Sequence, residues 1–232
     1  MVRQFSSLMN IITYTPDFSL LSVTVKKAYA EMGYKRQQPE EEVVELTTSL
    51  LKEIKDITAP SCAFKLYSGS VEGETVCLDE GSRLQVGAIL SSLLEGSERF
   101  VIFAATAGSS FQRYQDELKN EGDMLKRYIT DTIGSSIAEA TGDYMESMLE
   151  REITGFRHTH RFSPGYCGWH LSEQKEIFRL LDGEPCGITL SDVYLMQPIK
   201  SISGIIGVGK NVKENIYGCR YCELETCYKR KK

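Results

Sequence analysis

The sequence predicts one α+β domain followed by a short Cys-rich tail. Its 232 residues suffice for one large domain, and its apolar fraction of 41% suffices for a buried core. Helical and extended patterns follow one another irregularly, with too few helices between the strands for a doubly wound parallel sheet. No internal repeat, linker or change of composition divides residues 1–215, so we assign these to the domain and residues 216–232 to a Cys-rich basic tail.

The first third of the chain contains two helical patterns and two strands. Apolar spacing predicts a helix over residues 20–34 and a second helix from Pro39 through Ile57. Proline is favoured in the first turn of a helix, and the three glutamates that follow it complement the positive end of the helix dipole. Short runs over residues 62–67 and 75–78, joined around Glu72-Gly73, predict two strands.

The rest of the chain is mostly helical until its last quarter. Residues 100–105 are aromatic, β-branched or small, which predicts a short buried strand. The next helical pattern spans residues 110–152, with a break near Gly122. Ser172 is a favourable N-cap and Asp182-Gly183 a favourable terminator for a helix over residues 172–181. The other expected elements are a helix over residues 84–94 and extended segments over residues 186–190 and 194–204.

The helical pattern over residues 110–152 contains two glycines, Gly134 and Gly142, with small side chains between them. Glycine inside a helix costs roughly 1 kcal/mol relative to alanine, so this face is expected to be approached closely. We interpret it first as tight helix packing, with a nearby ligand as the alternative. Glu139 is a charged residue among these small ones, and it lies either on the exposed surface or beside a ligand.

The stretch Arg161-Phe162-Ser163-Pro164-Gly165-Tyr166 combines three features of a small-ligand site. The guanidinium of Arg161 can pair with a carboxylate or phosphate through two parallel hydrogen bonds. Pro164-Gly165 favours a turn in which Gly165 adopts a positive φ and leaves the backbone open to a ligand. Tyr166 adds an aromatic face with a polar tip. The alternative for Arg161 is a helix C-cap or a surface ion pair.

This stretch resembles the Arg-x-x-x-Gly-Tyr segment of the activation domain of cobalamin-dependent methionine synthase. Other segments resemble that family in the same order, namely Ile133–Ala140 upstream, and Thr189-Leu190, Met196-x-Pro198 and Ser201-Ile202-Ser203-Gly204 downstream. The stand-alone form of the domain, in which a Cys-rich tail is expected, is the most similar. The resemblance is densest from about residue 98 onward. It implies a twisted, largely antiparallel sheet flanked by helices.

The resemblance implies that S-adenosylmethionine is bound by Arg161, Pro164, Gly165, Tyr166 and Glu139. It also implies that the protein supports reductive remethylation (reactivation) of the cob(II)alamin form of a methionine synthase or related corrinoid methyltransferase. The partner is expected to carry the cobalamin, because the signature Asp-x-His-x-x-Gly does not occur in the sequence. An electron donor such as flavodoxin or ferredoxin is a further expected partner. No residue of this chain is expected to be catalytic, since no nucleophile or acid–base constellation is present.

Cys219-x-x-Cys222 and Cys227 indicate a metal site in the tail. Two thiolates separated by two residues can hold one tetrahedral metal, and the third cysteine lies within reach through a short loop. An iron–sulfur cluster and zinc both suit these ligands. The fourth ligand could be Cys167, Cys186, a water, a substrate or a group from a partner; free thiols are the alternative. Two other functions stay open, a metal or iron–sulfur electron-transfer protein acting on a corrinoid protein and a non-catalytic adaptor that caps one.

Composition and the remaining motifs argue against several other classes. A net charge of −5 argues against a nucleic-acid-binding protein. No apolar run reaches the roughly 18 residues of a membrane span, and a signal-peptide pattern is missing, so we expect a cytoplasmic location with reduced cysteines. Gly204–Lys210 has the spacing of a phosphate-binding loop, but Asn211 replaces its Ser or Thr, and we expect a glycine-rich turn. His158 and His160 are too few for a metal site.

Overall fold

The structure is a computed structural model that describes residues 10–34 and 37–212. These residues form an α+β domain, as predicted; the tail over residues 216–232, with its three cysteines, lies outside them.

The described strands are β1 (Ile12–Tyr14), β2 (Ser61–Glu72), β3 (Thr75–Leu78), β4 (Arg83–Gln85), β5 (Arg99–Thr106), β6 (Arg157–His158), β7 (Thr189–Leu190), β8 (Met196–Gln197) and β9 (Ser201–Gly209). The described α-helices are α1 (Val25–Glu31), α2 (Glu41–Ile57), α3 (Gly87–Leu93), α4 (Ser109–Leu118), α5 (Met124–Glu152) and α6 (Gln174–Leu180).

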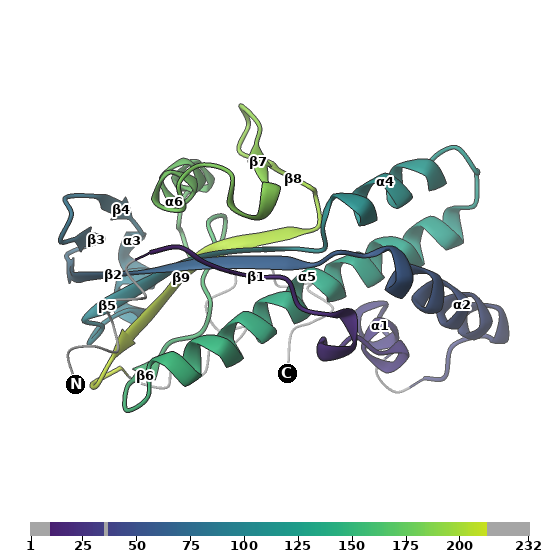
Figure 1. Ribbon diagram of the computed structural model, residues 1–232, viewed down its shortest axis with the longest axis horizontal. Coiled ribbons are helices and arrows are strands. Elements are labelled where there is room, and N and C mark those ends of the chain that lie inside the picture. Colours follow the sequence, from purple (N-terminus) through teal and green to yellow (C-terminus); the bar gives the residue numbers. More distant parts are fainter. Residues whose placement is uncertain (1–9, 35–36, 213–232) are drawn as a thin grey trace.

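Seven strands form one sheet in the order β4-β3-β2-β5-β9-β6, with β1 paired to β2. Its centre consists of the long strands β2, β5 and β9, in which Phe64 lies beside Phe103 and Phe103 beside Gly204. All of these pairs are antiparallel. β7 and β8 form a separate hairpin. Figure 1 shows the sheet twisting between helices, which confirms the architecture that the family resemblance implies.

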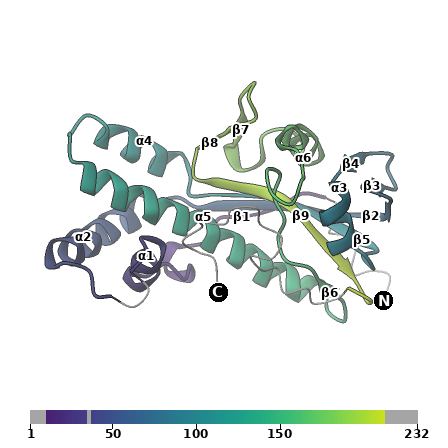
Figure 2. The ribbon, with the colours of Figure 1, turned by 180° about the vertical axis from the view of Figure 1, so that it is seen from behind.

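The sheet separates two hydrophobic clusters, because side chains alternate between its faces. On β5, Phe100 and Ile102 pack with residues of α3 and α6, whereas Val101 and Phe103 pack with residues of α5. All four side chains are fully buried. Seen from either side, α5 crosses one face of the sheet and α6 lies over the other (Figures 1 and 2). The central strand is therefore enclosed on both faces.

The 29-residue helix α5 belongs to two cores. Near its C-terminal end, Met145 and Leu149 pack against the sheet. Near its start, Ile129 and Ile133 pack instead in a third cluster with side chains of α1, α2 and α4. Figure 2 shows these helices gathered around the part of α5 that extends beyond the sheet. None of the described helices, α5 included, is both long and apolar enough to span a membrane.

Two expectations about the strands were wrong. Residues 84 and 85 belong to β4, because Leu84 pairs with Val76 and is buried against it, so the helix begins only at Gly87. Residues 204–209 continue β9 and do not form a turn. Their glycines allow close packing, since a Cβ on Gly204 would collide with the carbonyl oxygen of Phe162. The helix expected over residues 20–34 is also shorter, a 3-10 turn over Phe18–Leu20 followed by α1.

Gly204→Ala is expected to lower the free energy of unfolding by about 1–3 kcal/mol, the usual cost of overpacking. Urea unfolding followed by circular dichroism measures the loss. Ser203→Ala is the matched control, because Ser203 is buried and its hydroxyl has no hydrogen-bond partner among the described residues. Its removal should not lower stability, because no hydrogen bond is lost and a buried hydroxyl without a partner is removed. A Gly204→Ala protein as stable as the wild type would contradict this close approach.

Candidate functional site

The segment that carries Arg161 is positioned by pairing with β9. Strand β6 pairs with the end of β9, and the N–H of Thr159 donates to the carbonyl of Gly207 over 2.9 Å. Phe162 and Ile205 then exchange two backbone hydrogen bonds of 3.0 and 2.9 Å. Phe162 joins the cluster on the α6 face of the sheet. Because neighbouring side chains alternate, Arg161 points to the α5 face.

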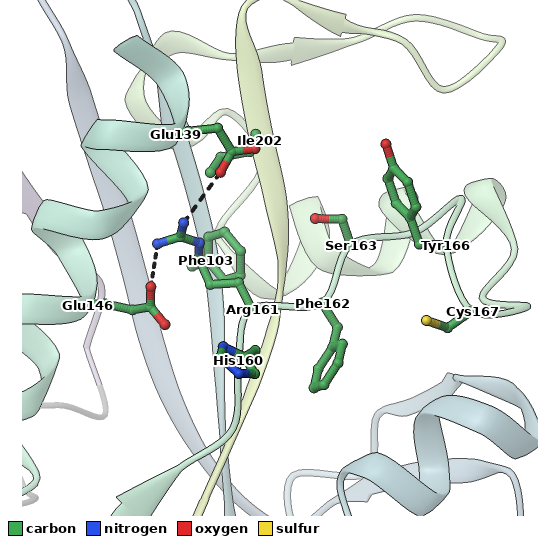
Figure 3. Close-up of a pocket in the computed structure, with 10 residues that line it drawn as sticks. All are labelled: Phe103, Glu139, Glu146, His160, Arg161, Phe162, Ser163, Tyr166, Cys167 and Ile202. Carbon is green, nitrogen blue, oxygen red and sulfur yellow. Dashed lines mark hydrogen bonds and ion pairs between the residues drawn. The ribbon is translucent and has the colours of Figure 1, made fainter. Parts of the chain in front are cut away.

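Arg161 is surrounded by three carboxylates of α5. Its Nη2 donates to Asp143 Oδ1 over 2.7 Å and to Glu139 Oε2 over 3.3 Å, and its Nη1 donates to Glu146 in a close contact. These acids are spaced four and three residues apart, which places them on one face of the helix. From the sequence we favoured ligand binding by Arg161 and kept an ion pair as the alternative; in the structure Arg161 forms ion pairs with these acids. Figure 3 shows the pairs with Glu139 and Glu146.

The members of this cluster differ in how far they are buried. The side chains of Arg161 and Glu146 are 15% and 21% exposed, whereas those of Asp143 and Glu139 are 55% and 61% exposed. Burial raises the pKa of Glu146, and the charge of Arg161 opposes that rise without cancelling it. Burial acts to lower the pKa of Arg161, but Glu146 and Asp143 raise it above its ordinary value. Arg161 and Glu146 therefore form the buried pair, while Asp143 and Glu139 face solvent.

Gly142 lets Arg161 lie against α5. A Cβ at this position would be 3.1 Å from Cζ and Nη1 of Arg161 and 2.7 Å from Cδ1 of Ile202. At Gly134 the approaching group is the buried ring of Phe111, the tight packing that we expected for this helix face. The two glycines thus have different roles. Gly134 accommodates a core side chain, and Gly142 accommodates the guanidinium of the candidate site.

The turn after Arg161 is fixed by a buried tryptophan. Gly165 has the expected positive φ, +94°, and its N–H donates to the carbonyl of Trp169 over 2.7 Å. Trp169 is 1% exposed, and Pro164 is also buried. Tyr166, in contrast, is 63% exposed. Pro164 and Gly165 therefore shape the loop, while Tyr166 is exposed on its surface (Figure 3).

A cavity of about 300 Å³ lies between α5, β9 and this loop. Of the five residues predicted to bind a ligand, Glu139, Arg161 and Tyr166 line it, and Pro164 and Gly165 do not. Sequence reasoning missed Glu146, His160 and Ile202, which line it as well. The helical spacing of residues 139, 143 and 146 was the available signal for the acidic residues. Figure 3 shows Glu139 and Glu146 reaching from the helix toward Arg161, with Tyr166 farther along the loop.

A second cavity, of about 520 Å³, adjoins the first, and Glu139 and Ile202 line both. Its other walls come from α1, from the small-residue part of α5 and from the segment just before β9. Lys200 lines this cavity, and its Nζ lies 2.8 Å from Asp131 Oδ1 and 3.0 Å from Ser135 Oγ. The two cavities together form a groove along α5.

The described residues contain no group of three or more His, Cys, Asp or Glu side chains placed to hold a metal ion. The ring of His158 contacts Glu150 over 3.3 Å and the carbonyl of Thr159 over 2.8 Å. Cys167 and Cys186 form no disulfide bond with another described residue. The metal predicted for Cys219, Cys222 and Cys227 concerns residues outside the described part of the chain.

Comparisons with known proteins identify a family by sequence and a related fold by structure. Residues 90–232, well over half of the chain, match the family profile described as the activation domain of vitamin B12-dependent methionine synthase. The fold is similar to that in the crystal structure of the MetH reactivation domain bound to AdoHcy, with a TM-score of 0.62. That similarity covers 89% of this chain and 81% of the other, at 16% sequence identity. At this identity it concerns the fold alone.

Arg161→Ala is expected to lower the free energy of unfolding by about 2–4 kcal/mol, because Glu146 would remain buried without a counter-charge. The double variant Arg161→Ala/Glu146→Gln should recover part of the loss. Arg179→Ala is the control, since Arg179 is 58% exposed and pairs with Glu176 on the surface; its removal should cost less than about 1 kcal/mol. Urea unfolding measures all three, and equal losses for Arg161→Ala and Arg179→Ala would show that the cluster does not stabilise the fold.

Proposed function

This chain belongs to the family of vitamin B12-dependent methionine synthase activation domains, and on that basis we propose that it binds S-adenosylmethionine to reactivate a corrinoid methyltransferase. The client is the cob(II)alamin form of a methionine synthase or of a related corrinoid protein. The observation that carries the proposal is the groove along α5, in which Arg161 meets the carboxylates of the helix. Small-ligand pockets typically measure about 300–1,000 Å³, and the two cavities lie in this range.

In the proposed complex the methionyl part of the ligand occupies the cavity at Arg161, and the adenosyl part occupies the adjoining cavity. Both terminal nitrogens of Arg161 already have protein partners, and in the proposed complex the ligand carboxylate replaces one of them. Asp143 and Glu139 are the partners to be replaced, because both are more than half exposed and regain water on release. Glu146, which is mostly buried, keeps Arg161 in place. Glu139, once released, lies free to accept a hydrogen bond from the ligand's amino group.

The partner's corrinoid would supply the cobalt chemistry, with an electron from a donor such as flavodoxin or ferredoxin and the methyl group from S-adenosylmethionine. This chain contributes binding and orientation, and we assign no catalytic residue to it. Tyr166 has its ring exposed beside the cavity, where it can pack on the ligand or on the partner's corrin. The domain therefore works as a component of the methyltransferase system.

Calorimetric titration with S-adenosylmethionine tests the proposal. The wild-type protein should bind, and Arg161→Ala/Glu146→Gln, which avoids an unpaired buried acid, should bind about 2–4 kcal/mol more weakly. Arg161→Lys should recover only part of the affinity, because lysine lacks the two-pronged geometry. Arg179→Ala should bind like the wild type. Absence of binding by the wild type would refute the proposal, and capture of a corrinoid protein without S-adenosylmethionine binding would identify an adaptor.

We also propose that Cys219, Cys222 and Cys227 hold an iron–sulfur cluster or zinc. A cluster would suit a reductive reaction, whereas zinc would tie the tail to the domain. Iron and zinc analysis of protein purified without oxygen is expected to give about one equivalent of metal or cluster, and Cys219→Ser/Cys222→Ser should abolish it. Freely titratable thiols and no metal in the wild type would exclude this site. A coloured protein that does not bind S-adenosylmethionine would instead indicate an electron-transfer protein.

A further inference from the structure

A further cavity, of about 380 Å³, lies between α4 and the first turns of α5. Met124, Arg127, Tyr128 and Asp131 line it from α5, and their spacing of three and four residues places them on one face of that helix. Side chains of α4 form the opposite wall, and Ile199, just before β9, completes the lining. Figures 1 and 2 show α4 running beside this part of α5.

The apolar side chains around this cavity are largely exposed to water. Met124, Tyr128 and Ile199 are 70%, 53% and 56% exposed, and only Leu118 of α4 is buried among the aliphatic groups that line it. The guanidinium of Arg127 lies beside this apolar surface, with its Nη1 3.7 Å from Met124 Sδ. Exposed apolar side chains that gather around one cavity are typical of a binding site.

One cation of this cavity has no acidic partner among the described residues. Lys119 is paired with Asp116 over 2.5 Å, and Asp131 is paired with Lys200 over 2.8 Å. Arg127 is half-buried and forms no ion pair with a described acid. The groups that line the cavity, together with their partners, therefore leave one positive charge over. Its planar guanidinium suits a carboxylate, which it can hold through two parallel hydrogen bonds.

We propose that this cavity binds a small apolar carboxylate, with the carboxylate on Arg127 and the apolar part against Met124, Tyr128 and Ile199. A neutral apolar molecule would leave the guanidinium without a counter-charge, and an inorganic anion would leave the apolar walls in water. Only a ligand with both parts uses both features. The volume lies in the range of small-ligand sites, about 300–1,000 Å³. The inference does not depend on the proposed function.

This site is separate from the groove along α5 but borders it. From Arg127 to Glu139 the helix axis extends about 18 Å. Ile199 lines both this cavity and the second cavity of the groove. Asp131 lines this cavity, and its partner Lys200 lines the groove. A ligand in this cavity therefore contacts a side chain that also borders the groove.

Titration with 4-methylpentanoate at constant ionic strength tests the inference. The methyl NMR signal of Met124, assigned with Met124→Leu, should shift and saturate. The neutral 4-methylpentanamide should bind at least about tenfold more weakly, because a charge-assisted contact is lost. Acetate should also bind at least about tenfold more weakly, because it buries fewer methylene groups. Equal binding of the carboxylate and the amide, or the absence of a saturable shift, would overturn the inference.

Variants test the two halves of the site. Arg127→Gln should weaken the binding of 4-methylpentanoate about tenfold. Arg113→Gln is the matched control, because Arg113 is an exposed arginine of α4 that does not line the cavity. Tyr128→Ser should weaken binding about threefold through the loss of apolar contact, whereas Leu20→Ser, at an exposed leucine outside the cavity, should not. Unchanged affinity in Arg127→Gln would show that this guanidinium does not hold the carboxylate.

Two sources carry this chemistry, a free carboxylic acid and the carboxyl terminus of another chain. N-acetyl-L-leucine copies a chain terminus, and its amide N–H can donate to Oε1 of Gln115, which lacks a hydrogen-bond partner among the described residues. Tighter binding of N-acetyl-L-leucine than of 4-methylpentanoate would identify a chain terminus as the ligand, and weaker binding a free acid. None of these measurements involves S-adenosylmethionine, so their failure would leave the proposed function intact.

Discussion

The close packing of α5 against β9 is the constraint on which the candidate site depends. Because Gly142 has no side chain, Ile202 and the guanidinium of Arg161 lie directly against the helix. The same approach brings the acids of α5 within reach of Arg161 and sets the width of the groove. On the other side, the pairing of Phe162 with Ile205 holds the backbone next to Arg161. A displacement of α5 would therefore disturb packing, charge pairing and cavity shape together.

Elements with strong local patterns could be predicted from the sequence. α2, β3, β5 and the break before α5 lie within two or three residues of their expected positions, since apolar periodicity or a buried β-branched run defines each. β1 and β6 were missed because three and two residues carry no period, and their strand character comes from partners distant in the chain. The apolar spacing over residues 84–94 fits a helix, and only the pairing of Leu84 with Val76 makes its start a strand.

The candidate site was predictable only in part. Arg161 and Glu139 were singled out, and they are in contact. Asp143 and Glu146 were not singled out, because charged residues on a long helix are usually solvated. Their spacing indicates a charge cluster only when a basic side chain is known to face that side of the helix. The chemistry of Arg161 could not be decided by sequence, since the same fork suits a helix acid and a ligand carboxylate. The structure shows Arg161 paired with acids of the helix, and the proposed function requires that a ligand carboxylate replace one of them.

The two ends of the groove differ in how far their walls depend on packing against the rest of the protein. One end is built on the sheet, whereas the other is closed partly by α1, a helix of seven residues. Helices this short do not persist alone in water, so α1 exists only while it is docked through Ala28 and its neighbours. Local unfolding of α1 would open one end and leave the Arg161 end closed, giving a gradient of hydrogen-exchange protection along the groove. A ligand that spans both ends would couple its own binding to the ordering of α1.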